Sequence, residues 1–548
     1  MNQIEEKLKA SISQAVEEAF GISFSAADAA IEIPKDKSHG DYATNTAMRL
    51  AKVVKQNPRM IAETLVSKID KEAAGIDRCE IAGPGFINFT MKSDSLSNVI
   101  KTVLEKKDEY GCSDTGKGVK INLEYVSANP TGDLHPGHAR GAATGDSCAR
   151  LLKMAGFDVT REFYVNDAGN QIDNMGRSLQ ARYLQACGVD CEMPEDGYHG
   201  PDLIAMAETL KAEYGDTLAH KDKQETFEIF REKGLVMELD KLKRDLALFK
   251  VEFDVWTSER SIYARGLVER AVNTLIEQGM TYEAEGALWL KTTTFGDDKD
   301  RVLRRSNGAY TYLTPDIAYH LDKLDRGYDQ LVNFFGADHH GYITRLKSAI
   351  QALGYASDKL DVDIIQMARM IKDGEEFKLS KRSGKSVALR DLIEEAGADA
   401  VRYFFASRAA DTQMDFDLDM ATKQSNENPV YYAQYAHARM CSILNAASDI
   451  EIADSFELIT HPKELALCRQ LNEFAGVVAD AAVTRMPHKM CNYIRALAQN
   501  FHSFYADCKV VDRDNIALSS QRLALVMAAK MTMKNALNSI GVSAPERM

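Results

Sequence analysis

Two histidines, His135 and His138, enclose a proline and a glycine in the order His-Pro-Gly-His. Residues three apart project from the same side of a helical turn, so both imidazoles could donate hydrogen bonds to one reacting phosphate. Backbone amides at a helix start lack internal partners and carry partial positive charge, which suits phosphate. Gly137 has no side chain, so a nucleotide could approach the backbone. The pattern predicts phosphoryl chemistry, although so short a motif also fits ordinary helix capping.

A basic loop is the next candidate for phosphate binding. Residues 372–386 contain four lysines and an arginine. A loop of this composition would concentrate positive charge on a polyphosphate. From residue types alone, a solvated basic loop is the more ordinary interpretation.

Adjacent histidines also occur in the turn Gly-Ala-Asp-His-His-Gly at 336–341. Neighbouring side chains rarely coordinate one ion, and no set of carboxylates and histidines at ligand spacing accompanies this pair. We therefore expect no metal site here.

The elements that must position these residues follow from hydrophobic periodicity. Alternation at 119–125 predicts a strand, and helical spacing predicts a helix from Gly137 to about Met154. Strand patterns also occur at 159–165, 331–335, 364–366 and, entering a helix, at 308–316. Strands followed by glycine turns and helices aim backbone amides at one edge of a sheet, where doubly wound folds bind ligands. We predict an α/β protein with a Rossmann-like doubly wound parallel sheet.

The chain divides into three parts by pattern. Residues 1–110 mix helices with a small antiparallel sheet, 111–420 hold the nucleotide-binding fold, and 421–548 form an all-α bundle. The mostly polar helical segment at about 176–294 is interpreted as an insertion between the two halves of the sheet. A charged, glycine-containing stretch at 101–117 predicts a linker.

Composition favours a soluble globular protein of about three or four domains. The chain has 548 residues, 45% hydrophobic and 27% charged, and a net charge of -14. This charge argues against a protein coated by nucleic acid, but it permits local basic patches. Nine scattered cysteines indicate free thiols in a reducing compartment. We expect a cytoplasmic protein, because the N-terminus lacks a signal-peptide core and no apolar run approaches membrane-spanning length.

The motifs together resemble those of class I aminoacyl-tRNA synthetases. His-Pro-Gly-His is similar to the family's His-x-Gly-His signature, and the preceding Ser127-Ala-Asn-Pro-Thr-Gly132 looks like the arginyl-tRNA synthetase version. Residues 378–382, Lys-Leu-Ser-Lys-Arg, resemble the Lys-Met-Ser-Lys-Ser motif, with Leu379 in place of Met and Arg382 in place of the last Ser.

The outer domains resemble those of bacterial-type arginyl enzymes. Gly-Asp-Tyr-Ala-Thr-Asn at 40–45 and Gly-Pro-Gly-Phe-Ile-Asn at 83–88 look like the N-terminal domain that contacts the tRNA corner. From residues alone, 1–110 would be a small packing or dimerisation domain. Tyr-Ala-His-Ala-Arg at 435–439 and the closing residues 541–548 look like the anticodon-binding domain.

The resemblance implies an arginyl-tRNA synthetase that uses ATP and Mg2+, with tRNA(Arg) and L-arginine as partners, no membrane and a monomeric state. It implies His135, His138 and Lys381 as catalytic residues. The nucleotide-binding positions that it implies are Ala128, Asn129, Pro130, Thr131, Gly132, Asp133, Leu134, Pro136, Gly137, Gly336, Asp338, His339, Lys378, Ser380 and Lys385. The sequence leaves open which of Lys378, Lys381 and Lys385 contacts the phosphates.

Arginine recognition has a clear physical requirement. A planar guanidinium needs carboxylates in its plane, with an aromatic face or hydroxyl to hold the stem. The positions that match the family's arginine contacts are Glu124, Asn129, Tyr312, Asp316 and His340. Losing a charged bidentate contact costs much more discrimination than losing a methylene, so we expect no editing domain.

Two other classes of protein share part of this pattern. A different class I adenylate-forming enzyme would explain the histidine and lysine motifs, but neither the carboxylate pair nor the helical C-terminal part. A non-catalytic RNA-binding descendant of a synthetase would have no reason to keep His135, His138 and Lys381 together.

Overall fold

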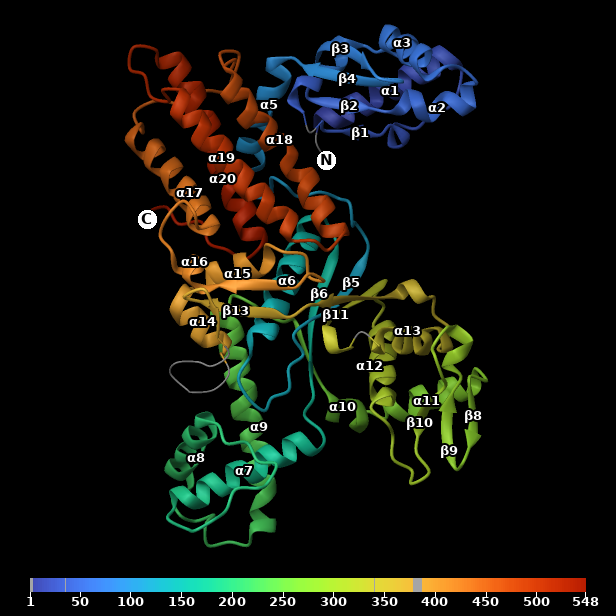
Figure 1. Cartoon of the computed structure of the whole chain (residues 1–548), viewed down its shortest axis with the longest axis vertical. Helices are drawn as coiled ribbons and strands as arrows, with labels where there is room; N and C mark the ends of the chain where they lie inside the picture. The colour runs from blue at the N-terminus through green and yellow to red at the C-terminus, as the bar shows by residue number, and fades with distance from the viewer. Residues whose placement is uncertain (1–2, 35, 340, 378–386) are drawn as a thin grey trace.

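The computed structural model describes residues 3–34, 36–339, 341–377 and 387–548. His340 and the basic-loop residues Lys378, Ser380, Lys381 and Lys385 lie outside the described residues, so their roles stay predictions. Figure 1 shows a central α/β domain, an N-terminal domain beside a helical bundle at one end, and a helical arm at the other.

A parallel sheet forms the centre of the molecule. Its strands are β5 (Lys120–Glu124), β6 (Asp158–Val165), β7 (Val255–Ser258), β11 (Gln330–Gly336) and β12 (Leu360–Ile365). They lie in the order β7–β6–β5–β11–β12, and every neighbouring pair is parallel. Residues 121–124 of β5 are all buried, as expected for a strand covered on both faces. The predicted doubly wound α/β fold is confirmed.

The strand order reverses between β5 and β11. Helix α6 (Pro136–Met154) connects β5 to β6, whereas α12 (Leu313–Asp325) precedes β11 and α13 (Tyr342–Ala352) follows it. The carboxyl ends of β5 and β11 therefore open the crevice in which doubly wound folds bind ligands.

The segment 176–294 differs from the single helical insertion that we expected. Strand β7 lies within it and pairs with β6, with Val255 opposite Glu162. The sheet therefore continues through this segment. All residues of β7 are only half-buried, because the strand lies at the edge of the sheet. So short and partly exposed a strand has no apolar alternation to recognise.

Inserted elements lie on both sides of β7. The helical arm before it consists of α7 (Asn170–Ala186), α8 (Pro201–Tyr214) and α9 (Lys223–Leu248). After it come α10 (Glu259–Ala264), α11 (Leu267–Glu277) and an antiparallel sheet of β8 (Thr281–Ala284), β9 (Ala287–Leu290) and β10 (Arg301–Arg304). Residues 308–312 do not form the expected strand. Within them, Tyr310 pairs with Arg304 in an isolated bridge.

The N-terminal domain packs helices on an antiparallel sheet. Helix α1 (Gln3–Phe20) buries Leu8, Ile12 and Val16, which lie on its predicted apolar face. The other elements are β1 (Ile31–Glu32), β2 (Tyr42–Thr44), α2 (Thr46–Val54), α3 (Pro58–Lys68), α4 (Lys71–Ala74), β3 (Ile76–Ala82) and β4 (Phe86–Met91). The sheet order is β1–β2–β4–β3.

The expected linker at 101–117 is partly helix. Helix α5 (Ser93–Lys106) packs on α18 (Pro462–Val483) of the bundle and buries Leu96, Ile100 and Val103. These positions repeat at helical spacing, and a linker beginning at residue 101 cuts the repeat in the middle.

The C-terminal part is helical, as predicted. Between the central sheet and the bundle lie β13 (Ala368–Lys372), β14 (Glu375–Glu376), α14 (Leu389–Ala396), α15 (Ala398–Ala406), β15 (Met414–Asp417) and α16 (Leu418–Thr422). The bundle itself contains α17 (Pro429–Ala446), α18, α19 (His488–Asp507) and α20 (Ile516–Ser539). None of the helices in the described part of the chain combines the length and apolar character needed to cross a membrane.

Candidate active site

A cavity of about 380 Å³ opens at the carboxyl ends of β5 and β11. Its wall includes the carboxylates Glu124, Glu259 and Asp316. The aromatic side chains of Tyr164 and Tyr342 also line it. Carboxylates with aromatic groups in one small cavity are suited to a planar cation.

Asp316 lies in the first turn of α12 and makes no ion pair among the described residues. The Tyr342 hydroxyl donates a hydrogen bond to its Oδ2. Burial raises the pKa of Asp316 to about 7, and the negative charges of Glu124 and Glu259 add to the rise. A half-buried carboxylate with a raised pKa and no paired cation would be stabilised by a cationic ligand.

Glu259 was not predicted from the sequence. It begins α10 directly after β7, and the amide nitrogen of Asn166 lies 2.9 Å from its Oε2 when that amide is oriented to suit both of its neighbours. Burial raises the pKa of Glu259, although a hydrogen bond from Tyr164 opposes the rise. Recognising β7 as a strand of the parallel sheet would have pointed to this residue, because ligand groups follow such strands.

Glu124, unlike the other two carboxylates, has a cation of its own. Lys323 of α12 donates to its Oε2 at 2.6 Å, and Ser127 donates to its Oε1 at 3.0 Å. The predicted Tyr312 also lines the cavity, but its side chain is 85% exposed, so it stands at the mouth.

A larger cavity of about 730 Å³ adjoins the first. The two share wall residues, including Val126, Ser127 and Phe335. Val126 and Ser127 have φ values of 70° and 39°, in the left-handed region that non-glycine residues rarely adopt. Such backbone strain persists only where surrounding contacts hold it. Here it turns the chain sharply where the two cavities meet.

The histidine pair lines the larger cavity at the start of α6. His135 Nδ1 accepts the backbone N–H of His138 at 3.3 Å, and His138 Nδ1 accepts that of His135 at 3.4 Å. The rings stack with centroids 3.6 Å apart. A Cβ on Gly137 would come within 2.9 Å of His135 Cε1, so the missing side chain gives the ring its place.

Burial and the hydrogen bonds between the two residues also determine the charge and the tautomer of the histidine rings. Burial lowers the pKa of His135, and it lowers the pKa of His138 to about 3, so both rings are neutral near pH 7. Because each Nδ1 accepts a hydrogen bond, each ring carries its hydrogen on Nε2. Helix capping therefore leaves two Nε2–H groups free to donate into the cavity.

The structure places the other predicted nucleotide positions in three settings. Ala128, Asn129, Gly137, Gly336, Asp338 and His339 line the larger cavity. Thr131, Gly132 and Asp133 line a neighbouring hollow of about 340 Å³, together with Gln171, which accepts a hydrogen bond from Asn129 at 2.7 Å. Pro130 and Leu134 are buried beneath this loop, and Pro136 begins α6.

The chain re-enters the described region close to these histidines after residue 386. The backbone N–H of Leu389 donates to the carbonyl oxygen of Leu134 at 2.6 Å, and Leu134 directly precedes His135. The segment that follows the predicted phosphate-binding lysines is therefore anchored beside the larger cavity.

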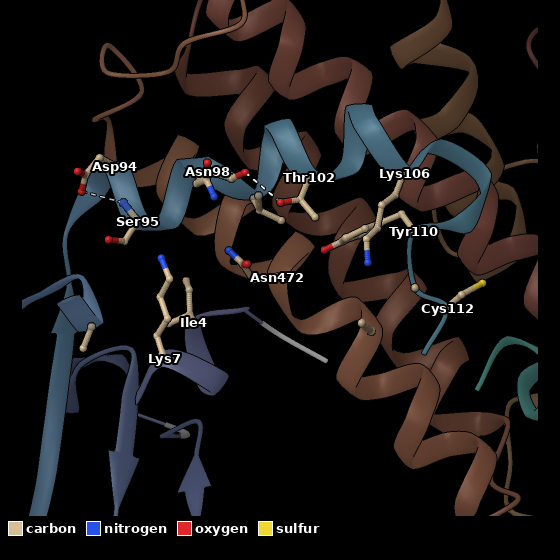
Figure 2. Close-up of a pocket in the computed structure, with 14 residues that line it drawn as sticks. Ile4, Lys7, Asp94, Ser95, Asn98, Thr102, Lys106, Tyr110, Cys112 and Asn472 are labelled. Atoms are coloured by element: carbon tan, nitrogen blue, oxygen red, sulfur yellow. Dashed lines mark hydrogen bonds between the residues drawn. The ribbon is translucent and has the colours of Figure 1, made fainter. Parts of the chain in front are cut away.

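A separate cavity of about 400 Å³ lies between the N-terminal domain and the bundle. Figure 2 shows Lys7 of α1, Asn98, Thr102 and Lys106 of α5, and Asn472 of α18 around it. None of the residues predicted to act on substrate lines this cavity.

Comparison with known proteins places these features in families. A family model described as tRNA synthetases class I (R), catalytic domain, matches residues 99–441. Models described as Arginyl tRNA synthetase N terminal domain and DALR anticodon binding domain match residues 6–91 and 433–548.

Individual relatives match over the whole length. The arginine–tRNA ligase of Bacillus cereus is 55% identical over 94% of this chain and 94% of its own. That of Anoxybacillus flavithermus is 53% identical over 100% of both chains. The solved arginyl-tRNA synthetase of Thermus thermophilus, at 22% identity, shares the fold with a TM-score of 0.76 over 99% of each chain.

Proposed function

The chain belongs to the arginyl-tRNA synthetases, and we propose that its two joined cavities divide the activation of arginine between them. As an arginine–tRNA ligase it uses ATP to form arginyl-adenylate and transfers arginine to the 3' terminal adenosine of tRNA(Arg), releasing AMP and pyrophosphate. In our proposal the smaller cavity holds arginine and the larger one holds ATP.

The observation that carries this assignment is the pair of half-buried carboxylates, Asp316 and Glu259, that make no ion pair among the described residues. A guanidinium presents a rigid fork of N–H donors and stays protonated, so it can bond to both. Glu124 lies on β5 and bonds to Ser127, which also lines the larger cavity. It is therefore suited to the α-ammonium group, near the reacting carboxylate.

The arginine carboxylate attacks the α-phosphorus of ATP, and the bond to the departing pyrophosphate breaks. Negative charge spreads over the phosphoryl oxygens in the transition state, so positioned donors matter more than a protein nucleophile. The Nε2–H groups of His135 and His138 can donate to these oxygens. In this proposal Lys381, with Lys378 or Lys385, supplies charge to the departing phosphates.

We do not assign Mg2+ to a protein site. Among the described residues, no three histidine, cysteine, aspartate or glutamate side chains converge as a metal site. We propose that Mg2+ arrives on the polyphosphate of ATP, whose oxygens are its preferred ligands.

The bundle offers a surface suited to the unpaired bases of tRNA. Tyr431 and Tyr435 of α17 stack in parallel, and Tyr435 stacks on His502 of α19. The exposed Arg439 lies over the rings of Tyr435 and Tyr505. Aromatic faces and guanidinium planes are the groups on which unpaired bases stack. We propose that this surface reads the anticodon and that the N-terminal domain contacts the tRNA corner.

The proposal describes a monomeric, cytoplasmic enzyme with domains at 1–110, 111–420 and 421–548. All nine cysteines are free thiols, which supports a reducing compartment.

Exchange of pyrophosphate into ATP tests the proposed function. Purified protein is assayed with arginine, and with lysine or cysteine as controls, each with and without tRNA. We expect exchange with arginine alone among these amino acids. Exchange with another amino acid would point to a sister family, and no exchange under any condition would favour the non-catalytic RNA-binding alternative.

A further inference from the structure

Lys323 is a buried lysine beside the arginine cavity that no step above uses. Its side chain is 0% exposed, whereas lysines are rarely buried unless they are paired. It lies seven residues after Asp316 on α12, and side chains at this spacing share one face of a helix. That face points toward the carboxyl end of β5.

Lys323 makes an ion pair with Glu124. Its Nζ donates to Glu124 Oε2 at 2.6 Å and lies 4.1 Å from the centroid of the Tyr319 ring. The second carboxylate oxygen accepts the hydroxyl of Ser127. Glu124 is thus held at both oxygens, one of them by a cation, whereas Asp316 and Glu259 make no ion pair among the described residues.

The nearest competing carboxylate has its own cation. Glu162 lies directly opposite Glu124 on the neighbouring strand β6. It accepts from Arg326 at 2.8 Å, from Thr257 at 2.5 Å and from Asn122 at 2.6 Å. The positive charges of Lys323 and Arg326 both lower the pKa of Glu162, but Lys323 donates its hydrogen bond to Glu124.

Resting on the function proposed above, we propose that Lys323 is a positioning residue that holds the carboxylate of Glu124 in place and aims it at the α-ammonium group of arginine. Three carboxylates in one small cavity repel one another, and such clusters take up protons unless a cation is present. Lys323 supplies that cation from within the fold, out of reach of solvent. It therefore sets the charge that an incoming arginine meets.

Other ionisable groups face the same space. From every element packed around Glu124 and Lys323 these are Glu162 and Tyr164 of β6, Glu259 of α10, Tyr312 just before α12, Asp316, Tyr319 and His320 of α12, Arg326 just after it, His339 after β11, and Tyr342 of α13. The positive charge of Lys323 lowers the pKa of Asp316. Removing this charge should therefore raise the pKa of Asp316, so that arginine binding requires a higher pH.

The test uses Lys323→Met, which keeps length but removes charge, and Lys323→Arg, which keeps charge. Pyrophosphate exchange with tRNA present gives kcat and KM for arginine and ATP between pH 6 and 9. For Lys323→Met we expect the KM for arginine to rise at least about tenfold near pH 7.5, with the KM for ATP changed by less than about twofold. The rising limb of kcat/KM for arginine should shift by about one pH unit, and Lys323→Arg should restore it.

Equal losses for arginine and ATP without a pH shift would overturn the proposal and leave Lys323 a purely structural residue. Unchanged arginine kinetics in Lys323→Met would also overturn it. If that variant does not fold, Glu124→Gln combined with Lys323→Met removes both partners. The KM for arginine of this double variant should match that of Glu124→Gln alone, and a much larger KM in the double variant would contradict coupling through Glu124. The wild-type protein is assayed first, because absent exchange there would reject the proposed function rather than the role of Lys323.

Discussion

Two cavities of nearly equal volume differ in whether the polar groups that line them have hydrogen-bond or ion-pair partners. The arginine cavity encloses about 380 Å³ and the interdomain cavity about 400 Å³. In the first, Asp316 and Glu259 are half-buried, with raised pKa values and no ion pair among the described residues. In the second, Asn472 donates to the backbone of Leu96 and Tyr110 donates to that of Leu471.

Volume alone therefore does not mark a binding site in this molecule. The wall of the interdomain cavity already satisfies its buried polar groups, as packed domain junctions usually do. The arginine cavity instead holds carboxylates that are partly removed from water without a paired cation. This lowers the stability of the folded protein unless a cationic ligand binds. Substitutions in the two walls should consequently have very different effects.

Asp316→Asn should cause the largest loss. The amide keeps the size of the side chain but removes the negative charge facing the guanidinium. Losing a buried charge pair costs about 4 kcal/mol, so kcat/KM for arginine should fall roughly a thousandfold while the KM for ATP changes little. Steady-state pyrophosphate exchange measures both. Unchanged Michaelis constants for both substrates would show that the cavity is wrongly assigned.

Glu259→Gln should have the second-largest effect. Glu259 is only half-buried and shares the guanidinium with Asp316, so we expect a loss in kcat/KM for arginine of roughly a hundredfold. Glu269→Gln on the neighbouring helix α11 is a matched control, because Glu269 is exposed and does not line the cavity. Equal behaviour of the two variants would remove Glu259 from the site.

Proton uptake by Asp316 should produce a moderate effect. Its pKa is raised from 3.8 to about 7, so below pH 7 the carboxyl group is mostly neutral. We expect kcat/KM for arginine to rise about tenfold per pH unit up to about pH 7 and then to level off. A profile that is flat between pH 6 and 8 would contradict a titrating Asp316.

The same shift predicts a change in stability. Between pH 3.8 and about 7 the folded protein holds a proton on Asp316 that the unfolded chain releases. The contribution of this group to the free energy of unfolding therefore falls as pH rises through that window. Arginine should raise the melting temperature more at pH 8 than at pH 6, which thermal unfolding with and without arginine measures.

The sequence predicted the parallel sheet because β5, β6 and β11 are well-patterned strands followed by glycine turns. The histidine pair could be found because its motif stands at a strand-to-helix junction. Glu259 was missed, since the edge strand before it has no periodicity. The partnership of Lys323 with Glu124 joins residues far apart in sequence, and only packing reveals it. The helix within 101–117 was missed because its apolar repeat begins before the charged stretch.

Substitutions in the interdomain cavity should have the smallest effect. Asn98 is exposed and Thr102 half-buried on the face of α5 shown in Figure 2, and the Thr102 hydroxyl donates only within its own helix, to the Asn98 carbonyl oxygen at 3.4 Å. Asn98→Ala and Thr102→Val remove polar side-chain groups without burying a charge, so stability should change by about 0.5 kcal/mol or less. Arginine and ATP kinetics should stay within about twofold of wild type. A tenfold rise in the KM for tRNA in either variant, with unchanged arginine exchange, would instead make this cavity part of the tRNA-binding surface, and the contrast between the two cavities would no longer hold.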